Sequence, residues 1–468
     1  MKLLRRFLSV ENLIDEKFKK GPLPSNKEAY STAFQMAWPS SVEMVLIGLI
    51  GSADLIMVSH LGSQAIAAAG ISTQPKFILL ALVLALNTGV TVIVSRRKGQ
   101  NRQEEANKIL MNAFFMSLII ATLMSTLGVV FARPILTLAG ASSDYLETAI
   151  IYFRIIAVGN FFTSVANTLT SAQRGAGNTK ISMVTNLTAN IVNIIFNFFL
   201  IYGVGPFPQL GVLGAGVATL IGNFVSFIIA LYSITRKTGF VSLSFSRKIK
   251  LELSRWMELI RVSSSAFVEQ IFIRVGFFVF AMVIAKLGTD AFATHNVTMN
   301  ILSLSFGVGE GLSIAASTLV GQNLGKKRQD LAMLYSKVLQ RIGLITSIIL
   351  GSALIIFRVE ILSLFSQGND IVLTLGEPVM FILGITVAFQ IIGVITIGTL
   401  RGGGDLKFTA FLMMVSIGIV RPITSYLFAI TFSGGLLAAW ISILLDQSIR
   451  SIASQKRFSS GKWLNIQI

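Results

Sequence analysis

The chain carries the same short motifs twice, in the same order. Four landmarks return 222 to 227 residues later: Val42-Glu43 as Val268-Glu269, Leu61-Gly62 as Leu287-Gly288, Gly99-Gln100-Asn101 as Gly321-Gln322-Asn323, and Arg174-Gly175 as Arg401-Gly402. Motifs that repeat at one nearly constant spacing indicate two homologous halves. In a membrane protein, two such halves typically face each other across a path, with a binding site at their interface.

Apolar stretches long enough to cross a bilayer fill most of the sequence. The 468 residues are 53% hydrophobic and only 13% charged, and a membrane helix needs about 20 apolar residues. Twelve stretches qualify: 32–59, 73–95, 109–132, 146–171, 181–203, 212–235, 257–285, 297–320, 333–357, 374–399, 407–430 and 434–450. We therefore predict an all-α integral membrane protein with 12 transmembrane helices in two six-helix repeats, related by a pseudo-two-fold axis along the membrane normal.

The domain boundaries follow from the same pattern. We expect a cytoplasmic N-terminal segment at 1–31, an N-lobe at 32–235, a cytoplasmic linker at 236–256, a C-lobe at 257–450 and a cytoplasmic tail at 451–468. Residues 1–29 do not resemble a signal peptide, because charged residues interrupt the apolar ones and no small-residue cleavage site follows. The segment reads either as a short interfacial amphipathic helix, ended by Pro22 and Pro24, or as a disordered basic tail.

The charge distribution predicts orientation and argues against nucleic-acid binding. The net charge is +18, but most Lys and Arg residues gather in alternate loops and at both ends of the chain. This asymmetry places both termini in the cytoplasm of a cell (inner or plasma) membrane. The chain has no Cys, which excludes disulfides and thiol chemistry. It also has no phosphate-binding G-x-x-x-x-G-K-[ST] loop, so it is not expected to hydrolyse ATP.

Ionisable residues inside the spans are the first functional candidates, because burying them in a membrane is costly. Four carboxyls lie away from the span ends: Glu43, Asp54, Glu269 and Glu310. Glu43 and Asp54 are 11 residues apart, about three turns and roughly 16 Å along one helix face, and Pro39 should soften that helix. Each carboxyl is expected either to carry a proton or bind a cation, or to be locked in an ion pair with Arg274 or Arg421.

Amides on the fifth span offer neutral oxygens. Asn190, Asn193 and Asn197 recur at helical spacing on one face. Their side chains can coordinate a cation or a substrate, or they can bond neighbouring helices together.

The motifs together resemble the multidrug and toxic compound extrusion (MATE) family over about residues 30 to 450. The resemblance rests on Ala53-Asp54-Leu55-Ile56-Met57-Val58, on the stretch from Ser303 to Gly325, on the paired Arg174-Gly175 and Arg401-Gly402, and on Arg421-Pro422. It implies two six-helix lobes around a V-shaped cavity. Asp54 matches the family's first-helix aspartate, and Glu269 matches a seventh-helix glutamate of the Na⁺-linked branch. That branch has an aspartate where this chain has Gln390, and another branch has one where this chain has Asn197.

The predicted function is secondary active efflux of organic cations and amphipathic compounds by antiport with H⁺ or Na⁺. Cation or proton coupling is assigned to Asp54, Glu43, Asn193, Asn197 and Glu269, substrate binding to Glu269, Glu310 and Gln390, and structural roles to Pro39, Arg174, Gly175, Arg401, Gly402 and Arg421. The proton is favoured, because it needs a single carboxyl whereas Na⁺ needs several oxygens. We expect a monomer that is no enzyme and needs no cofactor, apart from a Na⁺ ion if that is the coupling ion.

Rival functions make different demands on the sequence. A flippase for lipid-linked oligosaccharides or lipids of the same superfamily is the alternative, and it would need more cationic side chains to meet a diphosphate. A major-facilitator transporter would carry a Gly-x-x-x-Asp-x-x-Gly-Arg-Arg type loop after the second span, which is absent. A membrane enzyme would need a cluster of catalytic or metal-binding groups in a large loop, and the chain has short loops, two His and no Cys.

Overall fold

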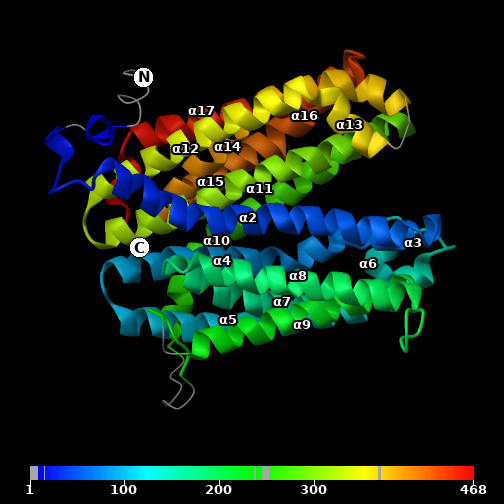
Figure 1. The fold of residues 1–468 in the computed structure, drawn as a ribbon, viewed down its shortest axis with the longest axis horizontal. Helices are drawn as coiled ribbons and strands as arrows, with labels where there is room; N and C mark the ends of the chain where they lie inside the picture. The colour runs from blue at the N-terminus through cyan, green and yellow to red at the C-terminus, as the bar shows by residue number, and fades with distance from the viewer. Residues whose placement is uncertain (1–8, 15, 237–238, 245–251, 367–369, 468) are drawn as a thin grey trace. The chain divides into compact units, whose positions relative to one another are not determined.

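The computed structural model describes residues 9–14, 16–236, 239–244, 252–366 and 370–467 (Figure 1). Twelve helical stretches among them are long and apolar enough to span a bilayer, six in each half. They comprise α2 (Asn26–Ser59), α4 (Thr73–Gly99), α5 (Gln103–Val130), α7 (Leu146–Gly175), α8 (Thr179–Tyr202), α9 (Val212–Thr235), α10 (Leu253–Ala285), α11 (Thr289–Gly325), α12 (Gln329–Ile356), α14 (Asp370–Gly403), the composite helix 406–431 and α17 (Gly435–Ser459). The predicted all-α fold with twelve spans is confirmed.

Several smaller elements complete the chain. The composite helix 406–431 joins α15 (Leu406–Met413), a π-helical segment (Met414–Val420), α16 (Arg421–Tyr426) and a second π-helical segment (Leu427–Thr431). Short helices are α3 (Ser63–Ile71), α6 (Ala132–Leu138) and α13 (Arg358–Ser366), and 3₁₀ turns lie at Glu11–Leu13, Glu16–Phe18 and Lys462–Asn465.

Several helices extend beyond their apolar cores. The span expected at 297–320 belongs to a helix that runs from Thr289 to Gly325, and the last span, expected to end at 450, continues to Ser459. The extra turns of α17 are polar and place Lys456 and Arg457 in its last turn, where cations interact favourably with the helix dipole. Hydropathy alone therefore predicted both helices as shorter than they are.

Close packing groups the chain into two units. Unit 1 comprises Met1–Val45 and Val268–Ile468, and unit 2 comprises Leu46–Phe267. In unit 1, α14 packs against α11, α12 and α17; in unit 2, α7 packs against α4, α5 and α9. The division falls inside α2 and α10, the first helix of each half. The lobe boundaries expected from the sequence, with the linker at 236–256, stay a prediction.

The first part of α2 joins unit 1 through small residues. Ala29, Ala33 and Ala37 recur every four residues and are almost fully buried. One turn further on, α2 passes α11 so closely that a Cβ on Gly311 would lie 2.3 Å from the Ser41 backbone. Pro39 lies within this segment, and α2 continues through it as one helix.

The first part of α10 joins unit 2 in a similar way. A Cβ on Gly89 of α4 would lie 2.3 Å from the Ser263 hydroxyl of α10, so the two helices touch at a glycine. At the start of α10, Glu258 accepts from Arg97 Nη2 at 2.9 Å and from Arg255 Nη1 at 3.1 Å. These ion pairs tie the end of α4 to the beginning of α10.

The repeated Arg-Gly motif makes the same contact in both halves. A Cβ on Gly175 of α7 would lie 2.7 Å from the carbonyl oxygen of Thr91 on α4. A Cβ on Gly402 of α14 would lie 2.3 Å from the carbonyl oxygen of Ser317 on α11. Thr91 and Ser317 are themselves 226 residues apart. The glycine of each motif therefore allows the fourth helix of its half to approach the second.

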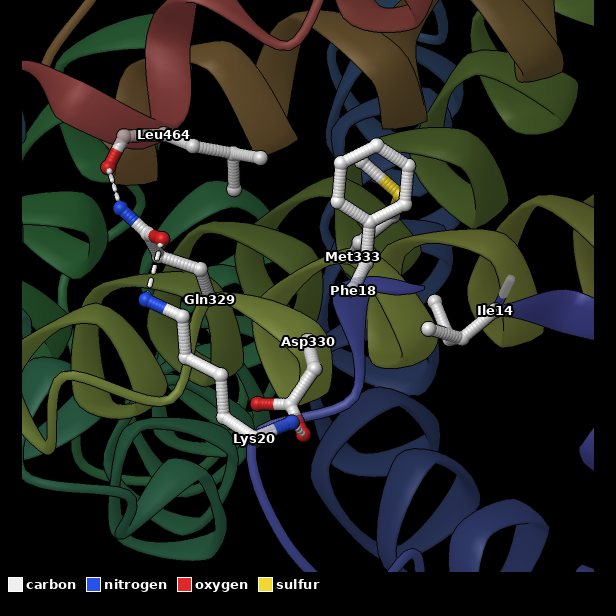
Figure 2. A pocket seen from close by; sticks show the side chains of 7 residues that line it. All are labelled: Ile14, Phe18, Lys20, Gln329, Asp330, Met333 and Leu464. Carbon is white, nitrogen blue, oxygen red and sulfur yellow. Dashed lines mark hydrogen bonds between the residues drawn. The ribbon is translucent and has the colours of Figure 1, made fainter. Parts of the chain in front are cut away.

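The N-terminal segment packs onto unit 1, as far as it lies within the described residues. Val10, Leu13 and Ile14 are buried, and Lys337 Nζ donates to the Leu13 carbonyl at 2.7 Å. Figure 2 shows Lys20 next to Gln329 and Asp330, with Phe18 and Met333 nearby. Residues 1–8 of the predicted amphipathic helix or disordered tail lie outside the described residues.

Candidate functional site

The centre of unit 2 holds the aspartate that the sequence singled out. Asp54 is the only acid of the last turns of α2, and its carboxylate Oδ1 accepts from Asn197 Nδ2 at 2.6 Å. Asn197 lies on α8, so the side chains are brought together by packing between helices 143 residues apart. A hydrogen bond to an ionised acceptor is about twice as strong as one between neutral groups, and it fixes the carboxylate against α8.

A second amide joins the same carboxylate. In the orientation that satisfies both ends of its amide, Asn193 Nδ2 donates to Asp54 Oδ1 at 2.9 Å, and its oxygen accepts from the Thr219 hydroxyl at 3.2 Å. Asn193 and Asn197 are one turn apart on α8, and Thr219 lies on α9. The sequence analysis placed the two amides beside Asp54 but missed Thr219, because a threonine in an apolar span gives no signal of its own.

Oxygen atoms around Asp54 are suited to a hard cation as well as to a proton. Asn197 is 1% exposed, and its Oδ1 has no hydrogen-bond partner within the part of the chain that the structure describes. Such an atom is costly unless something else satisfies it. Amide, hydroxyl and carboxylate oxygens are ligands that Na⁺ and other hard cations prefer, but the Asn193 oxygen faces Thr219 and both amides present N–H groups to Asp54. Binding a cation here would therefore require the amides to turn.

One basic and one aromatic side chain lie within electrostatic range of this centre. Lys76 of α4 acts on the Asp54 carboxylate as a positive charge, and Asp54 acts on the partly buried Tyr152 of α7. The centre therefore draws on five helices of unit 2. A bound cation at Asp54 would have to compete with the Lys76 ammonium for the carboxylate.

In unit 1, the Glu269 carboxylate forms an ion pair with an arginine. Arg401 Nη2 of α14 donates to its Oε1, and the Thr409 hydroxyl of α15 donates to Oε2 at 3.4 Å. Glu269 is 1% exposed. The sequence analysis weighed an ion pair with Arg274 or Arg421, and the structure shows Arg401, which was expected to serve only a structural motif. The expected coupling or substrate role of Glu269 stays a prediction.

The remaining predicted residues are dispersed within their units. Glu43 of α2 is 2% exposed, and Glu310 of α11 is partly buried and acts electrostatically on Arg401. Gln390 of α14 is 2% exposed, and its Oε1 has no hydrogen-bond partner among the residues that the structure describes. Arg174 Nη2 donates to Ser171 Oγ at 3.1 Å, one turn earlier on α7. None of these contacts tests the proposed roles.

A buried cluster in unit 1 escaped the sequence analysis. Asp446 of α17 is fully buried and accepts from Arg421 Nη2 at 2.5 Å and from Arg450 Nη2 at 3.1 Å. Arg421 was predicted as a structural residue, but Asp446 and Arg450 were not considered, because the last span was expected to end at 450. With the helix continuing to Ser459, Asp446 lies near its middle.

Comparison with known proteins agrees with this architecture. The family model described as MatE matches residues 39–199 and 265–427, which together are more than half of the chain. The chain belongs to the MatE family. Members of this family are transporters and not enzymes, so MatE membership makes the protein a multi-pass membrane transporter that moves small molecules across a lipid bilayer.

Curated relatives and a solved structure extend the comparison over nearly the whole chain. An uncharacterized transporter, YisQ, of Bacillus subtilis is 27% identical over 96% of this chain and 98% of its own length. A probable multidrug resistance protein, NorM, of Thermotoga maritima is 27% identical over 95% of this chain and 96% of its own. The outward-facing structure of a multidrug resistance MATE family transporter of the MOP superfamily superposes with a TM-score of 0.86 at 20% identity, covering 93% of this chain and 97% of that one.

Proposed function

We propose that this MatE transporter is a secondary active multidrug exporter that moves organic cations and amphipathic compounds out of the cell, driven by inward movement of a proton or Na⁺. The observation that carries the proposal is the Asp54 centre in unit 2, where one carboxylate accepts from two amides, one of which is held by the Thr219 hydroxyl. The names of the NorM relatives support multidrug substrates. The basic loops support a plasma-membrane location with both termini in the cytoplasm, and we propose a monomer.

Asp54 is the coupling residue in this proposal. A carboxylate held by two amides can take up a proton or a cation when the site opens to one side and release it when the site opens to the other. Because Asn193 and Asn197 direct N–H groups at the carboxylate, they stabilise its charged form. Taking up a proton requires no further ligand, whereas Na⁺ requires the amides to turn their oxygens inward. This difference favours the proton, with Na⁺ as the alternative at the same site.

A lipid-linked-oligosaccharide flippase fits the charges less well. Recognition of a diphosphate calls for cationic side chains that are available to it. In unit 1, the partly buried Arg401 and the buried Arg421 and Arg450 each bond a carboxylate. This cluster is therefore poorly suited to an anionic cargo.

The test is export by purified protein in proteoliposomes, with ethidium as the probe and one ion gradient imposed at a time. A pH gradient at equal Na⁺, without membrane potential, is expected to drive export, and Asp54→Asn to abolish it. Asp144→Asn, which neutralises an exposed loop acid, is the matched control and should transport normally. Export driven only by a Na⁺ gradient at clamped pH would replace the proton by Na⁺, and normal export by Asp54→Asn would refute the role of Asp54.

A further inference from the structure

Asp446 in unit 1 has every carboxylate oxygen occupied by donors of the protein itself. Its Oδ1 accepts from the Ser416 hydroxyl, and its Oδ2 accepts from Arg421 Nε at 3.2 Å, Arg421 Nη2 at 2.5 Å and Arg450 Nη2 at 3.1 Å. Ser416 and Asp446 are 0% exposed, Arg421 is 2% and Arg450 is 4%. Two guanidinium groups thus take the place that an exchangeable cation would need.

The helix that supplies two of these donors is irregular at this point. Ser416 lies in the π-helical segment Met414–Val420, and Arg421 follows directly after it. In a regular α-helix, residues five apart point about 140° away from each other. A π-turn is closed by hydrogen bonds between residues five apart, so it brings them onto one face. The π-segment is therefore what allows Ser416 and Arg421 to bind the same carboxylate.

Pro422 adds to this irregularity. It follows Arg421 and has no backbone N–H, so the helix loses one hydrogen bond there. The second π-segment, Leu427–Thr431, begins five residues later. With its backbone bonding weakened around residues 414–431, the composite helix depends more on side-chain contacts, and the Asp446 cluster provides three hydrogen bonds from Arg421 and Ser416.

We propose that Asp446 is a positioning residue for transport: it holds the composite helix 406–431 in its π-helical register and, with two resident guanidinium groups, does not exchange the coupling ion. This inference rests on the proposed function for its transport readout but not for its structural readout. It leaves Asp54 of unit 2 as the exchange site of the proposed function and gives Asp446 of unit 1 a fixed internal ion pair.

The two units support this assignment by contrast. In each half the polar centre involves the fifth and sixth spans: α8 and α9 in unit 2, and the composite helix and α17 in unit 1. Around Asp54, α8 contributes two neutral amides from an uninterrupted α-helix. Around Asp446, the composite helix contributes a guanidinium and a hydroxyl across a π-turn. In the first arrangement the hydrogen bonds to the carboxylate come from neutral amides, and in the second they include two guanidinium groups.

Other charged groups surround the cluster on the helices packed against it. Arg401 of α14 and Glu269 of α10 act on Arg450, and Arg421 stacks on the Phe277 ring at 4.8 Å and acts on His295 of α11. The Asp405–Arg457 ion pair lies near the C-terminal end of α17. Since Arg401 already bonds Glu269, Asp446 is the carboxylate that directly neutralises Arg421 and Arg450 in the described structure.

The first experiment separates positioning from ion exchange by transport kinetics. Asp446→Asn is expected to lower the maximal rate of ethidium export at least tenfold while leaving the apparent KM and the half-saturating ion concentration within twofold of the original protein. Asp446→Glu, which keeps the charge, should recover the rate to within threefold. The proposal would be overturned by any of three results: a half-saturating ion concentration that changes in Asp446→Asn, a maximal rate that does not change, or an Asp446→Glu variant as slow as Asp446→Asn.

The second experiment reads the helix register without transport. The chain has no cysteine, so single cysteines at 423, 424, 425, 426 and 427 can be spin-labelled one at a time in bilayers. Ile423 and Tyr426 are 53% and 45% exposed and Ser425 is 0%, which gives a clear accessibility pattern to oxygen. Asp446→Asn is expected to shift this pattern by one position, and an unchanged pattern would overturn the proposal. If Asp446→Asn does not fold, Ser416→Ala is measured instead, with the same expected shift and the same refuting result.

These readouts also keep the two proposals apart. If no ion gradient drives export by the original protein, the proposed function fails, while the spin-label pattern still decides the role of Asp446. If export is ion-driven and depends on Asp54 but the pattern is indifferent to Asp446, only the positioning role fails.

Discussion

Substituting Gly402 by alanine tests whether the repeated Arg-Gly motif serves helix packing. The new Cβ would lie 2.3 Å from the carbonyl oxygen of Ser317 and 2.7 Å from its Cα. Both are backbone atoms, so α14 and α11 must move apart. Overpacking of this kind costs about 1–3 kcal/mol. Alanine recovers at most about 1 kcal/mol through its better helix propensity, which leaves a net loss of about 0–2 kcal/mol. Because the clash is with backbone atoms, which cannot rotate away, we expect the upper half of this range, about 1–2 kcal/mol.

The measurement is the thermal unfolding midpoint of the purified protein in detergent, together with ethidium export. A loss of this size corresponds to a fall of roughly 2–8 °C in a large domain. Gly175→Ala, whose Cβ would lie 2.7 Å from Thr91 O, should lose less, and Gly70→Ala, with nothing within 4 Å, should lose nothing. A Gly402→Ala midpoint equal to that of Gly70→Ala would refute the reasoning.

Two further predictions contrast buried and exposed ion pairs. Glu269→Gln leaves the Arg401 guanidinium without its carboxylate in a buried site. We therefore expect the free energy of unfolding, measured by denaturation in mixed micelles, to fall by about 3–5 kcal/mol. A fall below about 1 kcal/mol would show that Arg401 finds another partner. Arg133 and Glu147 form a pair whose side chains are 58% and 69% exposed, so Arg133→Gln with Glu147→Gln should change stability by less than about 1 kcal/mol in the same assay, and a larger loss would contradict this assignment.

The parts of the fold that the sequence predicted well are those governed by hydropathy and periodicity. Twelve spans were predicted because lipid requires long, continuous apolar helices. Asp54 and Asn197 were selected as candidates because polar groups at membrane depth are costly unless they serve a purpose, and the structure brings them together. These constraints act on each segment by itself, so a single sequence is enough to apply them.

The missed contacts depend on how far helices extend and where side chains reach. Asp446 was overlooked because Arg450 was taken as the end of its span, whereas the helix continues to Ser459. Arg401 was assigned to a loop motif, yet its long side chain reaches Glu269 on α10. Likewise, the start of α2, up to Val45, packs with the C-terminal half of the sequence, and the start of α10, up to Phe267, packs with the N-terminal half. Only contacts between helices show this. Neither hydropathy nor spacing carries this information.

The repeat preserves packing more strictly than charge, and this difference bears on mechanism. Gly175 and Gly402 make equivalent contacts, but the position 226 residues after Asp54 is Phe280, a core residue that is 1% exposed. Arg401 bonds Glu269, while its counterpart Arg174 bonds Ser171 on its own helix. Two halves that pack alike can move as similar bodies. Asp54 of unit 2 accepts from neutral amides, whereas Glu269 and Asp446 of unit 1 each bond a guanidinium. If Asp54 is the one carboxylate that exchanges an ion, one ion per cycle is expected, and a measured ion-to-ethidium ratio of two would require a second carboxylate, such as Glu43 or Glu310, to exchange an ion as well.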